Sequence, residues 1–429
     1  MPNSDLIKPL LVNDLESVGG AAKAAKRLHL GLIANGVASR YLVSEKVSDD
    51  ETVLGPKSSL GRALSRFKLR SYLELLPLLF YPSRQRVPFS SAFFSSNAVN
   101  RINHVDADLI HLHWVAGGML RIESLAKIKK PLIWTLHDSW PFTGGCHVPF
   151  DCKSYTSGCG QCPVLQSNSN NDLSTKVLKR KTDTWKSLNI TIVTPSRWLA
   201  ECAKSSEMFK DKDIHVIPNG LDIQCFKPID KDFCRSVLNI ESEKKIILFG
   251  SFDPLRDKNK GYNYLADALH YFLNYYESSS VEFVIFGASK PLTPPDLGTK
   301  VHYMGVMQDE TSLALLYSAA DVMVVPSIQE SFGQTASEAL ACGCPVVAFE
   351  TSGLLDIVDH KVNGFLVSEF DSKKLAFGIN WVLENKERHH KLSMNAREKA
   401  VQYFDSKVVA RQYIDLYKKV LLSSNVDNE

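Results

Sequence analysis

The chain has 429 residues, a formal net charge of +3 and 44% hydrophobic residues. This length is too great for one ordinary hydrophobic core, so we expect two or three domains. The small net charge gives no argument for nucleic acid as a partner, and no apolar run reaches the roughly 18 residues of a membrane span. The first twenty residues lack a basic region followed by an apolar one, so we expect no signal peptide and a cytoplasmic location.

The chain alternates short apolar runs with longer helical patterns, which is typical of a parallel α/β sheet. In the first half we expect buried strands at residues 7–14, 38–45, 107–114, 131–138 and 190–196. In the second half we expect them at residues 245–251, 281–288, 301–306, 321–327, 345–350 and 364–369. The sequence therefore predicts two doubly wound, Rossmann-like domains whose strand ends face each other across a cleft.

The boundary between the halves lies where Pro218, Asn219 and Gly220 interrupt the pattern. We assign residues 1–216 to the first domain and residues 217–403 to the second. The tail, about residues 404–425, has the apolar spacing of an amphipathic helix that packs back onto a domain, and we assign it to the first.

One segment of the first half, Leu60–Arg86, mixes Arg and Lys with a dense apolar pattern. It is either a helix packed on the first domain with a basic outer face or a helix that rests on an anionic membrane surface. The second alternative would place the protein at the inner face of the cell membrane.

Two glutamates eight residues apart, Glu330 and Glu338, follow the expected strand 321–327. Glu330 lies in the loop at the carboxyl end of this strand, where ligands of such sheets bind. The next helix begins near Gly333, and its free backbone N–H groups suit an anionic phosphate. Glu338 lies one turn or more into this helix among small apolar residues. It is either an exposed helical glutamate or a carboxylate that accepts hydrogen bonds from a vicinal diol such as ribose.

The segment around these glutamates resembles the signature of the retaining glycosyltransferases of family 4, which have the GT-B fold. That signature is E-x-F-G-x-x-x-x-E-A-x-A-C-G-x-P-V-V, and the sequence matches it from Glu330 to Val347. Further resemblances follow the chain in order, in the glycine loop at 18–36, the histidine-bearing strand ends at 107–114 and 135–145, and the Lys260-Gly261 pair. Residues 54–100 resemble nothing in the family.

The resemblance implies roles for particular residues. It implies catalytic roles for His137, Glu330 and Lys260. It places Asp138 and His113 on the acceptor side. The donor-binding residues that it implies are Gly19, Gly20, Lys260, Ser331, Phe332, Gly333, Gln334 and Glu338, and we add Arg256 as a donor-binding candidate that the family pattern does not supply.

One position departs from the family pattern. Ser251 stands where the family usually has the arginine that neutralises the donor diphosphate together with Lys260. Arg256, a few residues later, is the nearest substitute, because a guanidinium suits bidentate phosphate binding. The alternative is that Arg256 is a solvated charge among other charged residues.

The implied reaction moves a hexose from a UDP- or GDP-linked sugar to a hydroxyl and keeps the anomeric configuration, without a metal cofactor. The stretch 135–147 is most similar to bacterial enzymes that build exopolysaccharide, capsule or O-antigen, so we expect a glycan or lipid-linked acceptor. Two alternatives remain, a nucleotide-sugar epimerase of similar fold and a catalytically silent nucleotide-sugar-binding protein. Donor turnover separates the silent protein from the enzymes.

Four of the nine cysteines, Cys146, Cys152, Cys159 and Cys162, lie within 17 residues. Their spacing, which ends in C-x-x-C, favours a structural zinc site. The alternative is a set of reduced packing cysteines, since a cytoplasmic protein rarely has disulfides.

Overall fold

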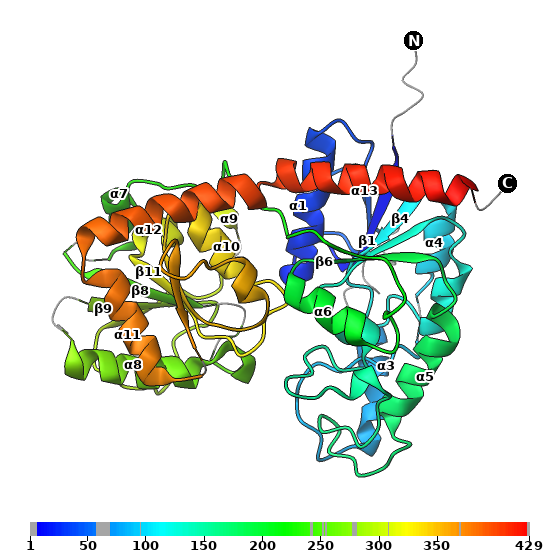
Figure 1. The fold of residues 1–429 in the computed structure, drawn as a ribbon, viewed down its shortest axis with the longest axis horizontal. Coiled ribbons are helices and arrows are strands. Elements are labelled where there is room, and N and C mark those ends of the chain that lie inside the picture. Colours follow the sequence, from blue (N-terminus) through cyan, green and yellow to red (C-terminus); the bar gives the residue numbers. More distant parts are fainter. Residues whose placement is uncertain are drawn as a thin grey trace. The chain divides into compact units, whose positions relative to one another are not determined.

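The computed structural model describes residues 7–56, 69–94, 96–240, 243–250, 253, 255–276, 281–307, 309–368 and 370–426. The chain forms two compact units (Figure 1). The N-terminal unit comprises Met1–Gly220 and Val409–Glu429, and the C-terminal unit comprises Leu221–Val408. The division follows Gly220, whereas the sequence placed it after residue 216. Both units contain a parallel sheet, which confirms the expectation of two Rossmann-like domains.

The described part of the N-terminal unit contains a seven-stranded parallel sheet in the order β3-β2-β1-β4-β5-β6-β7. Its strands are β1 (Pro9–Leu15), β2 (Arg40–Glu45), β3 (Val53–Leu54), β4 (Leu109–Leu112), β5 (Leu132–Thr135), β6 (Ile190–Thr194) and β7 (Ile214–Val216). The sequence predicted five of these strands and missed β3 and β7, which form the two edges of the sheet.

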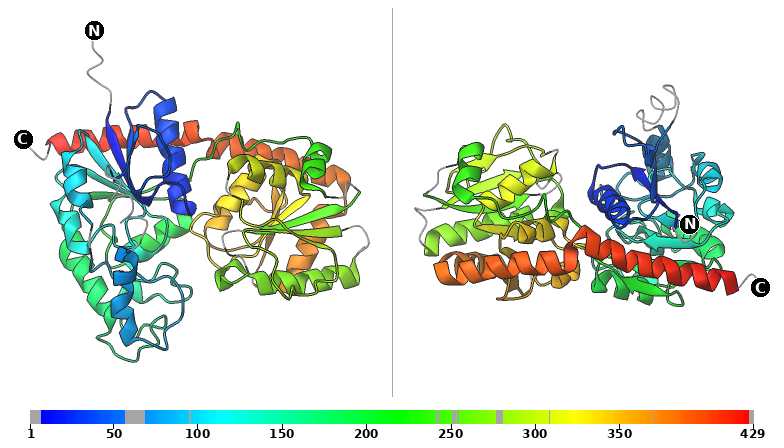
Figure 2. Two further views of the ribbon diagram at one scale, coloured as in Figure 1. Left: turned by 180° about the vertical axis from the view of Figure 1, so that it is seen from behind. Right: turned by 90° about the horizontal axis from the view of Figure 1, so that it is seen from above.

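Helices cover both faces of this sheet (Figure 2). The helices of this unit are α1 (Gly20–Ala34), α3 (Leu69–Leu75), α4 (Ala98–His104), α5 (Leu173–Trp185), α6 (Arg197–Ser205) and α13 (Ser406–Val426), with 3-10 turns η1 (Leu76–Phe80), η2 (Ile122–Lys127), η3 (Trp140–Phe142) and η4 (Ser154–Thr156), and α3 lies away from the sheet (Figure 1). Successive strand residues point to opposite faces, so Leu10 packs into the core beneath α4 and α5, and Leu11 into the core beneath α1 and α13.

The tail forms α13, which lies over the sheet of the N-terminal unit from Val409 onward. Val409, Tyr413, Leu416 and Tyr417 follow helical spacing and are all buried in the core that also holds Leu11. Burial of this stripe accounts for the docking of the helix.

The described part of the C-terminal unit contains a six-stranded parallel sheet in the order β10-β9-β8-β11-β12-β13. Its strands are β8 (Lys245–Gly250), β9 (Val281–Phe286), β10 (Val301–Tyr303), β11 (Val322–Val325), β12 (Val346–Phe349) and β13 (Gly364–Val367). All six coincide with predicted segments, because each is mainly apolar, and Lys245, Glu282 and His302 are the charged or titratable residues within them.

Its helices are α7 (Lys231–Leu238), α8 (Tyr262–Tyr275), α9 (Glu310–Ala319), α10 (Gln334–Ala341), α11 (Ser372–Leu383) and α12 (Lys386–Lys399), with short turns η5 (Lys258–Lys260), η7 (Ser352–Asp356) and η8 (Ala400–Phe404). Helices α8 and α11 pack on one face of the sheet, and α9 and α10 on the other. The segments that carry Lys260 and Glu330 follow the carboxyl ends of β8 and β11.

The segment Leu60–Arg86 is described only from residue 69 onward, and residues 57–68 lie outside the described part. From Leu69 it forms α3 and then η1. None of the helices in the described residues is both long enough and apolar enough to cross a membrane.

Candidate functional site

An ion pair marks the carboxyl end of the sheet in the C-terminal unit. The Lys260 Nζ lies 2.7 Å from the Glu330 Oε1, and each side chain is about one-fifth exposed, at 21% and 18%. Burial alone would lower the pKa of Lys260, but the attraction of the Glu330 carboxylate outweighs burial and raises this pKa above its ordinary value. Lys260 is therefore a cation at this edge at neutral pH.

Side-chain contacts of Asn259 and a close backbone approach at Gly261 fix this pair in place. The Asn259 side chain bridges the two loops, because its Oδ1 accepts from the Gln329 N–H at 3.0 Å and its Nδ2 donates to the Gln329 carbonyl at 2.7 Å. Gly261 follows with φ 68° at the start of α8. A Cβ at this glycine would collide with the Pro326 carbonyl. Gly261 is thus required for the close approach of the two loops.

Replacing this glycine tests the close approach. Gly261→Ala is expected to lower the free energy of unfolding by about 2 kcal/mol more than Gly305→Ala does. Both glycines have φ 68°, but a Cβ at Gly305 would meet no atom within 4 Å, so that variant isolates the cost of the backbone conformation. Urea denaturation of both variants measures the difference, and equal losses would contradict the argument.

The loop between Glu330 and α10 is also tightly packed. Phe332 is buried and contacts Phe404 edge to face at 5.5 Å between ring centroids. Gly333 adopts φ 107° at the N-terminal end of α10, where a Cβ would meet Leu354 at 2.8 Å. Gln334 is half-buried at the first position of the helix, and Ser331 is half-buried beside Phe332. Glu330, predicted to be catalytic, and the predicted donor-binding residues 331–334 therefore lie together on one closely packed turn.

Glu338 is buried, with 3% of its surface exposed. Its Oε2 accepts a hydrogen bond from the Tyr317 hydroxyl of α9 at 3.0 Å. The structure thus rules out an exposed helical glutamate, one of the two alternatives from the sequence. The other alternative, a diol-binding carboxylate, stays a prediction.

Arg256 is exposed, and its backbone N–H closes a turn on the Asp253 carbonyl at 3.2 Å. Ser251, the position of the family arginine, lies outside the described residues. That Arg256 takes the role of the family arginine therefore stays a prediction.

In the N-terminal unit, two histidines from neighbouring strand ends form a hydrogen-bonded pair. The His113 Nδ1 lies 2.9 Å from the His137 Nε2. Burial lowers the pKa of His137 to about 4, against the opposing effect of Asp138. Burial, His111 and His137 together hold the pKa of His113 well below its ordinary value. Both rings are therefore neutral at pH 7, and one must donate to the other.

The second nitrogen of His113 indicates which ring donates. His113 Nε2 is buried and has no hydrogen-bond partner among the described residues. A buried N–H without a partner is rarer than a buried acceptor without one, so the proton of His113 belongs on Nδ1. His137 then accepts at Nε2 and carries its own proton on Nδ1, as a hydrogen-bond donor.

The carboxylate of Asp138 organises the loop that follows His137. It accepts hydrogen bonds from the Trp114 Nε1 at 2.9 Å, the Trp140 N–H at 2.9 Å and the His147 Nδ1 at 2.6 Å. Burial opposes its charge, but His147 and these donors hold the pKa of Asp138 below its ordinary value. In this structure Asp138 is a structural anchor of the predicted acceptor side.

Lys181, which the sequence analysis missed, holds the same loop through hydrogen bonds. This lysine is fully buried in α5, and its Nζ donates to the carbonyls of Trp140 and Thr143. The ammonium also lies 4.0 Å from the centroid of the Trp140 ring. Burial lowers the pKa of Lys181 to about 7. A single lysine about forty residues away thus holds the turn after His137 and Asp138.

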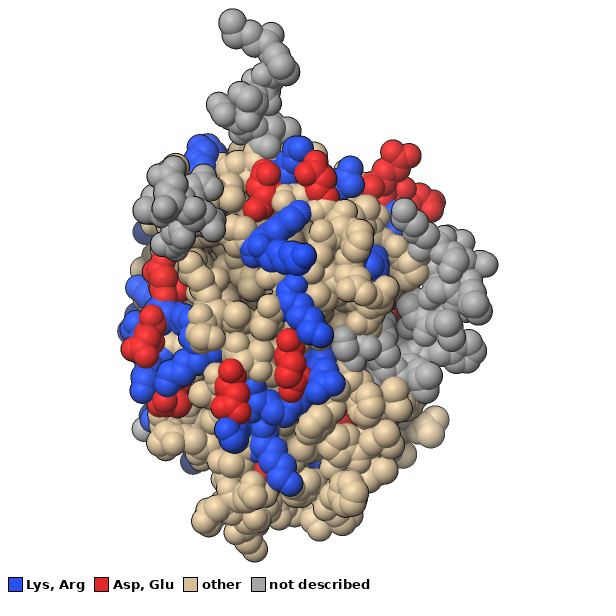
Figure 3. Space-filling model, turned by 90° about the vertical axis from the view of Figure 1, so that its right-hand side faces the viewer, with Lys and Arg blue, Asp and Glu red and all other residues tan. Residues whose placement is uncertain are grey.

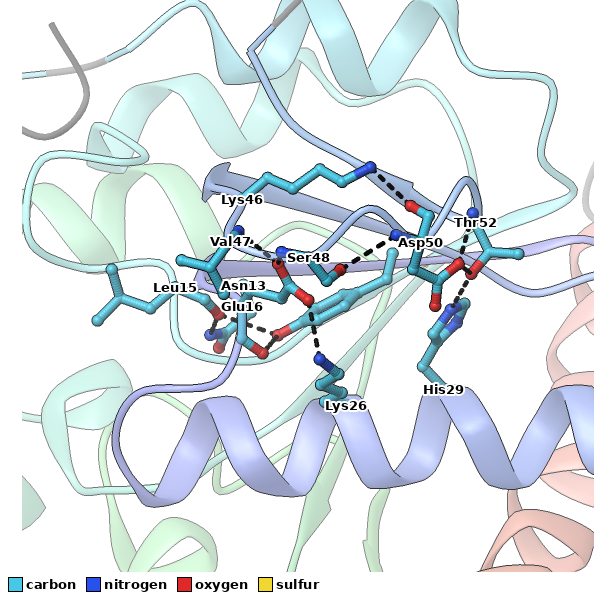
Figure 4. A network of polar contacts seen from close by, with 11 residues as sticks. Asn13, Leu15, Glu16, Lys26, His29, Lys46, Val47, Ser48, Asp50 and Thr52 are labelled. Atoms are coloured by element: carbon cyan, nitrogen blue, oxygen red, sulfur yellow. Dashed lines mark hydrogen bonds and ion pairs between the residues drawn. The ribbon is translucent and has the colours of Figure 1, made fainter. Parts of the chain in front are cut away.

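Contacts of Glu16 hold the glycine loop before α1 in place (Figure 4). Glu16 is buried, and its carboxylate accepts from the Lys26 Nζ at 2.8 Å and from the Val47 and Ser48 N–H groups at 2.6 and 2.9 Å. Burial opposes the charge of Glu16, but these donors outweigh it and lower its pKa to about 2. The loop then reaches Gly19, which adopts φ 88°, and Gly20, where α1 begins.

The four clustered cysteines are all free thiols. Cys146 and Cys162 are buried and Cys152 and Cys159 are half-buried. Within the described ranges, no three His, Cys, Asp or Glu side chains are arranged to hold a metal ion. The structure thus lends no support to a zinc site, which stays a prediction.

Comparison with known proteins extends over nearly the whole chain. Residues 18–224 match the family described as "Glycosyltransferase Family 4", and residues 230–399 match "Glycosyl transferases group 1". The sequence is 27% identical over 333 residues to an uncharacterised glycosyltransferase of Methanocaldococcus jannaschii, a match that covers 72% of this chain and 82% of that protein.

Solved structures share the fold. A sucrose-phosphate synthase from Thermosynechococcus elongatus has a TM-score of 0.68 at 20% identity, covering 97% of this chain and all of its own. The Anabaena protein HepE, solved in complex with UDP and glucose, has a TM-score of 0.61 at 19% identity, covering 96% of this chain and all of its own. This protein belongs to glycosyltransferase family 4 and has the GT-B fold.

Proposed function

We propose that this protein is a retaining glycosyltransferase that moves a hexose from a UDP- or GDP-linked sugar to a hydroxyl of a glycan or lipid-linked oligosaccharide. The ion pair of Lys260 and Glu330 at the carboxyl ends of β8 and β11 carries the proposal. Ligands of open α/β sheets bind at this edge. The presence of UDP and glucose in the HepE structure supports a nucleotide-sugar donor.

In this proposal the Lys260 ammonium neutralises part of the negative charge of the donor diphosphate. Its ammonium is paired with Glu330 in the structure and would exchange this carboxylate for the phosphate oxygens. Glu330 is then free to accept hydrogen bonds from hydroxyls of the donor sugar. Because the leaving diphosphate gains negative charge in the transition state, a fixed cation there lowers the barrier. The backbone N–H groups at Phe332 and Gly333 and the exposed Arg256 add to this stabilisation.

His137 serves the acceptor side. With its proton on Nδ1, the ring offers a hydrogen-bond donor to an oxygen of the sugar or the acceptor. The lowered pKa of His137 keeps it neutral, so it orients the substrate without adding a charge. The leaving phosphate itself takes the proton of the attacking hydroxyl, which accounts for retention without a carboxylate nucleophile on the opposite face.

The substitution of Glu338 tests the donor site. Calorimetric titration with UDP, GDP and ADP is expected to show binding of one nucleotide, weakened about tenfold or more in Glu338→Gln because a ribose diol loses its charged acceptor. Tyr317→Phe is the matched control, since it removes the hydroxyl that contacts Glu338 but keeps the carboxylate. Equal affinity in Glu338→Gln and wild type would contradict ribose binding.

We also propose that the protein acts in cell-surface polysaccharide synthesis in the cytoplasm. The similarity of residues 135–147 to enzymes of that pathway supports this part. An epimerase and a silent nucleotide-sugar-binding protein are the competing functions, and both predict that no sugar is transferred.

A further inference from the structure

The outward face of α3 and η1 is apolar. Five side chains on this short segment, which we name the α3–η1 patch, are exposed to water: Tyr72 (66%), Leu75 (45%), Leu76 (46%), Leu79 (70%) and Phe80 (85%). Single exposed apolar residues are ordinary, but a contiguous group on one element indicates a binding surface.

The inward face of the same segment is anchored to the unit. Glu74 is buried, and its carboxylate accepts from the Ala92 N–H at 2.7 Å and the Ser91 hydroxyl at 3.1 Å. Leu78 is buried in the core, and the Tyr81 hydroxyl accepts from the Leu173 N–H at 2.9 Å. The acidic side chain of Glu74 thus points into the protein, while the five apolar side chains of the α3–η1 patch point outward. These contacts fix the orientation of the segment, so the exposure of the patch is not the result of a loosely packed helix.

The charges around the patch are basic. Between residues 72 and 86 the sequence has one acid, the buried Glu74, and two bases, Arg84 and Arg86, neither of which is buried. The contact of Tyr81 with Leu173 brings the start of α5 beside the patch, and Lys176 is exposed near the start of α5. Lys and Arg side chains gather over one side of the N-terminal unit, with fewer Asp and Glu among them (Figure 3).

We propose that the α3–η1 patch docks this protein on a membrane surface that carries anionic headgroups. The apolar side chains enter the boundary between headgroups and acyl chains, and the flanking arginines contact the headgroup phosphates. A second copy of the chain is a poorer occupant, because a two-fold interface would bring the Arg84 and Arg86 of both copies together. This inference goes beyond the proposed function, since it requires neither the donor nor the acceptor.

Co-sedimentation of the full chain with vesicles tests the docking. Wild type is expected to bind vesicles of 30% phosphatidylglycerol in phosphatidylcholine and to bind pure phosphatidylcholine much more weakly. The double variant Leu79→Ser/Phe80→Ser is expected to lose about tenfold or more in affinity, because two large apolar side chains no longer enter the bilayer. The matched control is Phe233→Ser/Val237→Ser, which removes two half-exposed apolar residues from α7 and leaves binding unchanged.

A second variant tests the electrostatic part. Arg84→Gln/Arg86→Gln is expected to lower binding to the anionic vesicles several-fold and to reduce its sensitivity to salt. Thermal denaturation and nucleotide titration are expected to match wild type for both patch variants, which separates a failure of docking from a failure of the donor site. Absence of wild-type binding to anionic vesicles at low salt would overturn the proposal. So would a dimer in solution that dissociates in Leu79→Ser/Phe80→Ser without any vesicle binding.

Discussion

Lys260→Ala is expected to lower kcat/KM for sugar transfer by about 100- to 1000-fold, equivalent to roughly 3–4 kcal/mol of transition-state stabilisation. The ammonium is the cation that Asn259 and Gly261 hold beside Glu330 at the carboxyl ends of β8 and β11. Its loss removes the charge that opposes the departing diphosphate. Steady-state kinetics with the donor identified by titration measure the change.

Lys258→Ala is the control for this variant. Lys258 lies two residues earlier in the same short turn, η5, and its side chain is exposed. Exposed charges are screened by solvent, so the expected change is less than threefold. Comparable losses in the two variants would mean that general charge near the loop matters and that the Lys260–Glu330 pair has no special role.

The N-terminal unit is expected to lose stability steeply as the pH falls from about 6.5 to about 4. Burial lowers the pKa of His29 to about 4 and that of His111 to about 3, and His113 and His137 are lowered as well. These histidines stay neutral in the fold, whereas the unfolded chain takes up protons below about pH 6.5. The unfolded state therefore binds more protons, and the free energy of unfolding falls by up to about 5 kcal/mol per pH unit near pH 5.

Urea denaturation at several pH values measures this loss, with fluorescence of the buried Trp134, Trp140 and Trp185 as the signal of the N-terminal unit. His29→Gln is expected to reduce the pH slope by about 1.4 kcal/mol per pH unit, the share of one proton. His104→Gln, which changes an exposed histidine of the same unit, is expected to leave the slope unchanged. A slope that is flat from pH 6.5 to pH 5 would contradict neutral burial.

The strands were largely predictable, because most are apolar runs bounded by turns. The two that the sequence analysis missed, β3 and β7, have two and three residues and lie at the edges of their sheet. Edge strands pair on one side only and need not be continuously apolar, as the partly exposed Ile214–Val216 shows. Segments of two or three residues are too short to show a periodicity in the sequence.

The candidate site was predictable as a set of segments and not as a set of contacts. The motif located Glu330 and Lys260, but their ion pair joins residues 70 positions apart. Tyr317 beside Glu338, Lys181 beneath Trp140 and Lys26 against Glu16 have no motif of their own. Each is a long side chain that reaches a partner brought near only by the packing of separate elements.

Hydrolysis of a donor sugar, followed by proton NMR, tests the central claim most directly. UDP- and GDP-linked hexoses of α configuration are incubated with wild type and Lys260→Ala, with water as a slow acceptor. The account predicts that wild type cleaves one donor, that the α-anomer of the free hexose appears before mutarotation, and that Lys260→Ala barely reacts. Release of the β-anomer first, conversion of the donor into an epimer, or no cleavage of any donor would contradict it.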